Sequence, residues 1–136
     1  MDILLVDDDV IDRELFVDAI NLVGKQYRIT EAENGEKALE YLNSTLRLPQ
    51  LIILDLNMPV KDGRETLQDI KAHNIFKSIP VCIMSTSNAQ FDITNAYDNG
   101  ANLFLVKPLE FKQLIEMLSS LLTLFAKYVT LASKTV

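Results

Sequence analysis

The sequence has one cysteine, one histidine and no tryptophan among its 136 residues. The lone Cys82 excludes a disulfide framework, and it lies in an apolar run where an inert, buried thiol is expected. His73 stands alone, so the chain lacks the cluster of His and Cys ligands that a zinc site requires. Internal repeats and Pro/Ser-rich linkers are also missing, and the length suits one globular domain.

Long apolar runs and basic runs are missing as well. No stretch approaches the roughly 18 residues of a membrane span, and Met1 leads into an apolar strand instead of a basic leader. We therefore expect a complete cytoplasmic protein with no membrane partner. The 19 acidic residues outnumber the 13 basic ones, and a net charge of -6 without basic runs argues against a nucleic-acid partner. The first 23 residues alone carry seven acidic side chains against Arg13, so the acidic excess lies at the N-terminus.

Short apolar runs alternate with segments of helical period. The runs lie at residues 3–6, 27–32, 51–54, 81–84 and 103–106. Between them, apolar side chains recur every three or four residues: Ile11, Leu15, Ala19 and Leu22, then Ala38, Leu39 and Leu42, then Leu67, Ile70 and Ile75, and last Phe111, Leu114, Ile115, Leu118, Leu122 and Phe125. The alternation predicts an α/β fold of βα units around a parallel sheet that helices cover on both faces.

Several polar residues are typical of helix starts. Asp9, with Asp12 three residues later, and Ser87, with Gln90 three residues later, have the spacing of N-cap signals. We interpret Asp9, Asp12 and Asp62 as turn residues or caps, because that is the usual role of a single Asp beside a helix.

Other polar residues stand where the predicted strands end. Asp7 and Asp8 follow the first strand, Asp55 the third, Ser85 the fourth and Lys107 the fifth. The carboxyl ends of parallel strands meet at one edge of a sheet, which is where ligands of such folds bind. The sequence therefore predicts three carboxylates, a hydroxyl and an ammonium along one edge.

Three clustered carboxylates call for a cation. Two unit charges about 4 Å apart repel by roughly 4 kcal/mol at an effective dielectric constant of 20. Oxygen ligands alone favour a hard ion such as Mg2+, and a lysine beside such an ion indicates a phosphoryl group whose charge both would offset. The alternative is a plain ion pair between Asp55 and Lys107 that serves only the structure.

Four motifs in order resemble the receiver domain of two-component response regulators. They are Leu4-Leu5-Val6-Asp7-Asp8-Asp9, Leu54-Asp55-Leu56-Asn57-Met58-Pro59 followed by Asp62-Gly63, the segment 80–85, and Leu105-Val106-Lys107-Pro108. The resemblance covers about residues 2–126 and implies a three-layer, doubly wound (βα)5 fold of the flavodoxin-like type, with parallel strands in the order 2-1-3-4-5. We expect a receiver domain at residues 1–126 and a short tail at 127–136 that is extended or contacts a second copy.

The resemblance also implies the role of each residue at the predicted edge. Asp55 is expected to accept the phosphoryl group. Asp8, Asp55 and the backbone carbonyl of Asn57 are expected to bind Mg2+ or Mn2+, with Asp7 acting through water. Lys107 is expected to contact the phosphoryl oxygens, and Ser85 to move and donate a hydrogen bond to them.

Three further positions carry expectations from the same resemblance. Phe104 falls at the switch position, where a ring turns inward when Ser85 moves; many relatives have Tyr there, and plain core packing is the alternative. Asn57 and Ser87 stand two residues beyond Asp55 and Ser85, where side chains tune the lifetime of the phosphorylated state. The expected activity is limited to self-phosphorylation and slow autodephosphorylation, so the chain is not expected to be an enzyme in the ordinary sense.

The expected partners are a sensor histidine kinase or a phosphotransfer protein. The kinase should be selected by the exposed face of the first helix, which we place at Arg13, Glu14, Val17 and Asp18. The signal should leave through the face made by residues 103–106 and the helices before and after them, toward a downstream protein or a second copy of the chain.

The last helix carries a second apolar stripe, at Met117, Leu121, Leu124 and Tyr128. Either this stripe docks a partner or a second copy, or the tail folds back over it. An apolar last helix with a short extended tail is similar to the single-domain regulators that act with bacterial phytochromes.

Two other classes of function remain open. A phosphatase of the haloacid dehalogenase type also uses an Asp nucleophile and Mg2+, but it needs a second Asp where this chain has Asn57. A flavin-binding module would need a loop rich in Ser, Thr or Gly after the first strand, whereas residues 7–10 carry three acidic side chains that repel phosphate.

Overall fold

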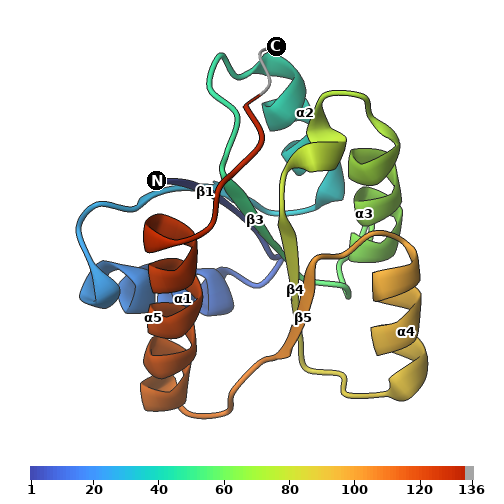
Figure 1. Cartoon of the computed structure of the whole chain (residues 1–136). Coiled ribbons are helices and arrows are strands. Elements are labelled where there is room, and N and C mark those ends of the chain that lie inside the picture. Colours follow the sequence, from blue (N-terminus) through green and yellow to red (C-terminus); the bar gives the residue numbers. More distant parts are fainter. Residues whose placement is uncertain (134–136) are drawn as a thin grey trace.

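The computed structural model describes residues 1–133, which form a parallel sheet of five strands, alternating with five α-helices (Figure 1). The strands are β1 (Asp2–Val6), β2 (Arg28–Ala32), β3 (Leu51–Leu54), β4 (Val81–Ser85) and β5 (Leu103–Val106). The helices are α1 (Val10–Val23), α2 (Gly35–Ser44), α3 (Gly63–Ala72), α4 (Gln90–Asp98) and α5 (Phe111–Lys127), with a 3-10 turn, η1 (Phe76–Ser78), before β4. The predicted alternation is confirmed.

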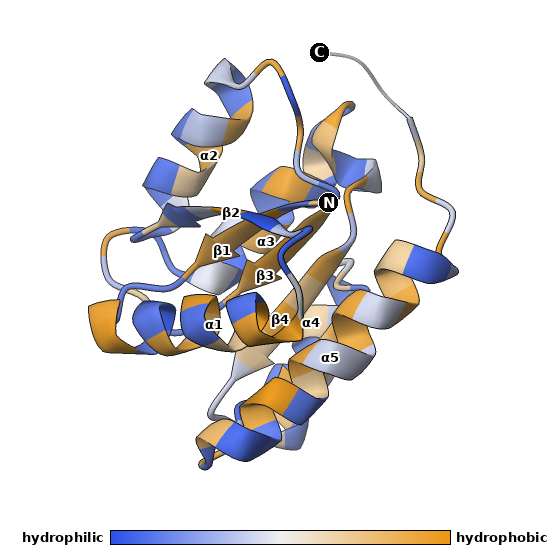
Figure 2. Ribbon diagram, turned by 90° about the vertical axis from the view of Figure 1, so that its left-hand side faces the viewer, coloured by the Kyte–Doolittle hydropathy of each residue, from blue (hydrophilic) through white to orange (hydrophobic). Residues whose placement is uncertain are grey.

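The strand order β2-β1-β3-β4-β5 confirms the predicted topology. The order reverses between β1 and β3, which pair directly from Ile3 with Leu51 to Val6 with Leu54. Helices α1 and α5 cover one face of the sheet, while α2, α3 and α4 cover the other (Figures 1 and 2). The residues that follow β1 and β3 are therefore neighbours at the switch point, where doubly wound sheets bind their ligands.

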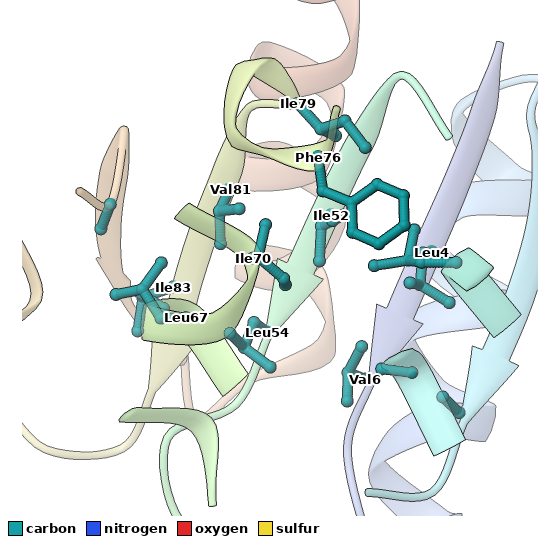
Figure 3. Close-up of a cluster of buried hydrophobic side chains, with 14 of the residues drawn as sticks. Leu4, Val6, Ile52, Leu54, Leu67, Ile70, Phe76, Ile79, Val81 and Ile83 are labelled. Atoms are coloured by element: carbon teal, nitrogen blue, oxygen red, sulfur yellow. The ribbon is translucent and has the colours of Figure 1, made fainter. Parts of the chain in front are cut away.

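The central strands are buried on both faces. In β1, Leu4 and Val6 pack toward α2 and α3, while Ile3 and Leu5 pack toward α1 and α5. Figure 3 shows the first of these cores, in which side chains of β1, β3 and β4 meet Leu67 and Ile70 of α3 and residues of the segment before β4. Full burial of one such side chain stabilises the fold by about 1.5 to 3 kcal/mol, which fixes the positions of the strand ends.

The predicted core face of α1 is wrong. Phe16, Ala19 and Ile20 are buried against α5 and the sheet, whereas Ile11 and Leu22 are 64% and 66% exposed. Of the predicted stripe, Ala19 is the buried member. Apolar side chains occupy both sides of this helix, so a spacing of three and four residues fits either face. Packing against α5 selects the face with the phenylalanine ring.

Two of the predicted caps are confirmed. The Asp9 carboxylate accepts hydrogen bonds from the backbone N–H groups of Ile11 (2.9 Å) and Asp12 (3.2 Å) at the start of α1. Asp62 caps α3 in the same way. Asp12 itself is not a cap, since it lies inside the first turn of α1.

The predicted start of the fourth helix is displaced. Helix α4 begins at Gln90, with Ala89 at the N-cap position and, within residues 1–133, no side chain capping it. Ser87 lies two residues before that position, and its hydroxyl oxygen accepts a hydrogen bond from the Ala89 N–H at 3.2 Å. The spacing of Ser87 and Gln90 therefore predicts the N-cap two residues too early, because the loop continues past Ser87 before the helix begins.

The predicted second stripe on the last helix is interrupted. Leu121 is buried in the core beneath α1 and α5, while Leu124 and Tyr128 are 49% and 76% exposed. After α5, residues 128–133 run on without helix or strand, and Val129 and Leu131 pack against the same core. Residues 134–136 of the predicted tail lie outside the described residues. Within residues 1–133, no helix has the length and apolar character needed to cross a membrane.

Candidate functional site

The backbone brings the ends of β1 and β3 side by side. The Asp55 N–H donates to the Val6 carbonyl at 3.0 Å, and the Asp7 N–H donates to the Ala32 carbonyl of β2 at 3.1 Å. Asp7 is buried, and its Oδ1 also accepts the Asp9 N–H at 3.0 Å. Hydrogen bonds of the sheet thus fix the backbone of both residues, and with it the place where each carboxylate begins.

Asp7, Asp8 and Asp55 form the predicted carboxylate cluster. One oxygen of each lies within 4.8 Å of the oxygens of the others, with Asp7 and Asp55 buried and Asp8 exposed. Burial raises the pKa of Asp55 to about 6; the Lys107 ammonium acts in the opposite direction, and the negative charge of Asp7 adds to the rise. This oxygen-only donor set, open to solvent on the Asp8 side, fits a hard divalent cation that keeps part of its water shell.

Lys107 joins the cluster from β5. Its Nζ lies 2.9 Å from Asp7 Oδ2, 3.4 Å from Asp12 Oδ2 and 3.7 Å from Asp55 Oδ2. Burial acts to lower the pKa of this ammonium, but the hydrogen bond to Asp7 and the nearby carboxylates outweigh burial, so the pKa lies above its ordinary value. The ion pair between Asp55 and Lys107 is present, but it is not a simple pair, because the lysine also contacts Asp12 and bonds most closely to Asp7.

The loop after Asp55 is tightly turned. Gly63 leaves room for the Asp55 carbonyl oxygen, since a Cβ at this position would lie 2.1 Å from it. Val60 has a positive φ of 67°, which is rare for a β-branched residue, and the Lys61 N–H donates to the Pro59 carbonyl at 2.8 Å around it. Asn57 is exposed in this loop, with its N–H 3.5 Å from Asp55 Oδ1.

Ser85 and Phe104 occupy neighbouring strands beside the cluster. Ser85 ends β4, is fully buried, and its Oγ accepts the Ser87 N–H at 3.1 Å. Phe104 pairs with Ile83 in β5, is half-buried, and packs against the core drawn in Figure 3. Its backbone N–H donates to the Tyr97 hydroxyl of α4 at 3.1 Å.

Sequence reasoning missed two residues of α1. Asp12 turns toward Lys107, and Arg13 donates from Nη1 to the Asp7 carbonyl at 2.7 Å and from Nε to Glu31 at 3.2 Å. Arg13 is thus held against the strand ends instead of standing on an exposed kinase-facing surface, and of the four residues placed on that surface, Glu14 and Asp18 are the exposed ones. Because α1 starts three residues after Asp7, its first turn lies over the strand ends. This short spacing is the feature of the sequence that could have indicated the contacts of Asp12 and Arg13.

The chain belongs to the response regulator receiver family. The family's receiver-domain profile matches residues 3–119, a range that includes Asp7, Asp8, Asp55, Ser85 and Lys107. The fold described above is accordingly the flavodoxin-like receiver fold, and the protein is a signalling protein of the two-component type.

Relatives of known structure agree over nearly the whole chain. The response regulator Rcp1 of Synechocystis sp. is 34% identical over 136 residues, which cover 95% of this chain and 91% of Rcp1. The crystal structure of the phosphorylated cyanobacterial phytochrome response regulator RcpA superposes with a TM-score of 0.90 at 33% identity, over 97% of this chain and 98% of RcpA. The Mn2+-bound form of Rcp1 superposes with a TM-score of 0.87 at 31% identity, over 97% of this chain and 99% of that one.

Proposed function

We propose that the Asp55 carboxylate accepts a phosphoryl group from a phosphohistidine of a sensor histidine kinase or a phosphotransfer protein. The observation that carries this proposal is the meeting of Asp7, Asp8 and Asp55 with the Lys107 ammonium at the switch point of the sheet. Family membership supports it, because receivers act with such partners.

The reaction needs little beyond positioning and charge neutralisation. The P–N bond of the donor breaks with its electron pair passing to the imidazole nitrogen, while an Asp55 oxygen forms the new P–O bond. The rigid end of β3 fixes the attacking carboxylate, and Lys107, 3.7 Å away, is within reach of the incoming phosphoryl oxygens. The resulting acyl phosphate hydrolyses slowly, so self-phosphorylation and slow autodephosphorylation are the activities we propose.

The donor set supports a Mg2+ or Mn2+ ion as cofactor. Asp8, Asp55 and the carbonyl of Asn57 would hold it, with Asp7 acting through water, and the ion would offset the charge on the phosphoryl oxygens. The Mn2+-bound form of the relative Rcp1 is consistent with this choice. Arg13 contributes indirectly, because it holds the Asp7 carbonyl and so fixes the end of β1.

The conformational change that follows phosphorylation is proposed to begin at Ser85 and Phe104. Ser85 would turn its hydroxyl toward the phosphoryl group, and Phe104 would follow inward, which alters the face made by α4, β5 and α5. Asn57 and Ser87 would tune the lifetime of the mark. A downstream protein or a second copy would then bind this face or α5. In this proposal the protein acts in the cytoplasm, with residues 1–126 as the receiver domain and residues 127–136 as a short tail.

The phosphatase alternative is not favoured. Asn57, which stands where such a phosphatase needs an acid, is an amide and cannot donate a proton to a leaving group as a carboxylic acid does. The family assignment of residues 3–119 points the same way.

Incubation with acetyl phosphate and Mg2+, followed by intact-mass measurement, tests the proposal. One added phosphoryl group is expected in the wild type and none in Asp55→Ala. An Asp18→Asn variant, which changes an exposed carboxylate of α1, serves as the matched control and should accept the group. An adduct that persists in Asp55→Ala, or a wild type that forms none, would overturn the assignment.

A further inference from the structure

We propose that Asp92 and Arg64 are positioning residues that couple Ser85 to helix α4 through Ser87. This inference rests on the proposed phosphorylation of Asp55 and names the residues through which its effect would reach α4. It concerns residues that neither bind the ion nor contact the phosphoryl group.

A continuous set of hydrogen bonds links α3, the loop between β4 and α4, and the first turn of α4. The Ser87 hydroxyl donates to Asp92 Oδ2 at 2.6 Å, and Arg64 Nη2 of α3 donates to Asp92 Oδ1 at 3.1 Å. Both bonds involve an ionised group, which makes them stronger than neutral ones. Asp92 thus ties the β4–α4 loop to the first turn of α4 and ties that turn to α3. We call this set the Arg64–Asp92–Ser87 bridge.

Ser85 contacts the bridge at Ser87. Its Oγ accepts the N–H of Ser87, so the backbone and side chain of one residue connect the predicted switch hydroxyl to Asp92. A turn of Ser85 toward Asp55 must either break the 3.1 Å bond to the Ser87 N–H or draw Ser87 along. Because Ser87 is held by Asp92, the second path moves the first turn of α4.

Helix α4 depends on few contacts for its position. Its one fully buried residue is Ala96, and its N-cap residue, Ala89, makes no side-chain hydrogen bond to the first turn. The bridge therefore holds the start of α4 in place of the side-chain cap and the larger buried face that α1, α2 and α3 have. The bonds from Ser87 and Arg64 also lower the pKa of Asp92, so its carboxylate stays ionised well below neutral pH.

The other end of α4 meets the second predicted switch residue. The Tyr97 hydroxyl accepts the backbone N–H of Phe104 at 3.1 Å. Helix α4 is thus attached at one end to the segment that carries Ser85 and at the other to the strand that carries Phe104. This arrangement gives a movement of the first turn a route to β5.

Hydrogen exchange measured by mass spectrometry tests the coupling. Wild type, Asp92→Ala, Arg64→Gln and the control Asp98→Ala, which removes an exposed carboxylate of the same helix, are each compared with and without acetyl phosphate and Mg2+. Intact mass confirms the phosphoryl adduct in every sample. We expect phosphorylation to change deuterium uptake at residues 87–98 in wild type and in Asp98→Ala, and the change to fall below half in Asp92→Ala and Arg64→Gln.

The readout separates coupling from simple support. If Asp92 only stabilised α4, its loss would raise exchange equally in both states and leave the phosphorylation-dependent difference intact, which would overturn the inference. So would a phosphorylated wild type with no change at residues 87–98, or loss of the change in Asp98→Ala. If Asp92→Ala does not fold, Ser87→Ala breaks the bridge while keeping the Arg64–Asp92 ion pair, and the same loss is expected. A wild type without the adduct contradicts the proposed function instead.

Discussion

The Lys107 ammonium lies 2.9 Å from Asp7 and 3.7 Å from Asp55. In this structure, the lysine therefore offsets the charge of the more deeply buried carboxylate and makes no close hydrogen bond to Asp55. The two carboxylates are close enough that a short movement of the ammonium would exchange the first partner for the second. Asp12, at 3.4 Å, is the third carboxylate that holds the lysine side chain at the strand ends.

Removal of this lysine charge should destabilise the fold. In Lys107→Met the Asp7 carboxylate, with a side chain only 3% exposed, loses its partner while Asp55 stays close by. We expect the free energy of unfolding to fall by roughly 3 kcal/mol, as for other broken buried pairs. Urea denaturation measures this, and added Mg2+ should recover more stability in the variant than in wild type. Equal midpoints for the two proteins without Mg2+ would contradict the charge argument.

The exposed carboxylate of Asp8 should reveal the metal site. Asp8→Asn removes one of the mutually repelling charges and one proposed ligand. The melting temperature without metal should therefore rise, while the further rise that Mg2+ causes in wild type should disappear, because a bound ion stabilises only the state that binds it. Thermal unfolding with and without Mg2+ measures both effects. Asp18→Asn is the control, and it should respond to Mg2+ as wild type does.

The layout of the site could be predicted because it depends on strand ends. Unbroken apolar runs such as residues 51–54 mark buried parallel strands, and the polar residue after each run then falls at one edge of the sheet. That reasoning placed Asp7, Asp55 and Lys107 together, as the structure does. This prediction requires only the strand topology, and no knowledge of how side chains pack.

Details that depend on packing between helices could not be predicted in this way. The face of α1 depends on where α5 lies, and α4 begins only after a loop in which Ser87 bonds to Asp92, five residues further on. The contact of Asp12 with Lys107 joins residues 95 positions apart. Such contacts follow from tertiary geometry, which local spacing does not carry.

The corrected face of α1 can be measured by comparing two truncations. Ile20→Ala removes a fully buried side chain from the core beneath α5 and should lower the free energy of unfolding by about 3 kcal/mol. Leu22→Ala removes one that is 66% exposed and should change it by less than about 0.5 kcal/mol. Urea denaturation of both variants gives the comparison. A larger loss in Leu22→Ala would restore the face that the sequence pattern indicated.

The thiol of Cys82 should be unreactive in the folded protein. Burial in β4 raises its pKa to about 12, so almost no thiolate is present at neutral pH and reagents cannot reach the sulfur. We expect a thiol-specific reagent to label the protein only at the rate of unfolding, and to label it at once in concentrated urea.

The unfolded thiol ionises near its ordinary pKa while the folded one stays protonated. The free energy of unfolding should therefore fall by about 1.4 kcal/mol per pH unit from this group between the two pKa values, and Cys82→Val should show a smaller alkaline loss. Rapid labelling of folded protein at pH 8 would show that the sulfur is accessible and contradict this assignment.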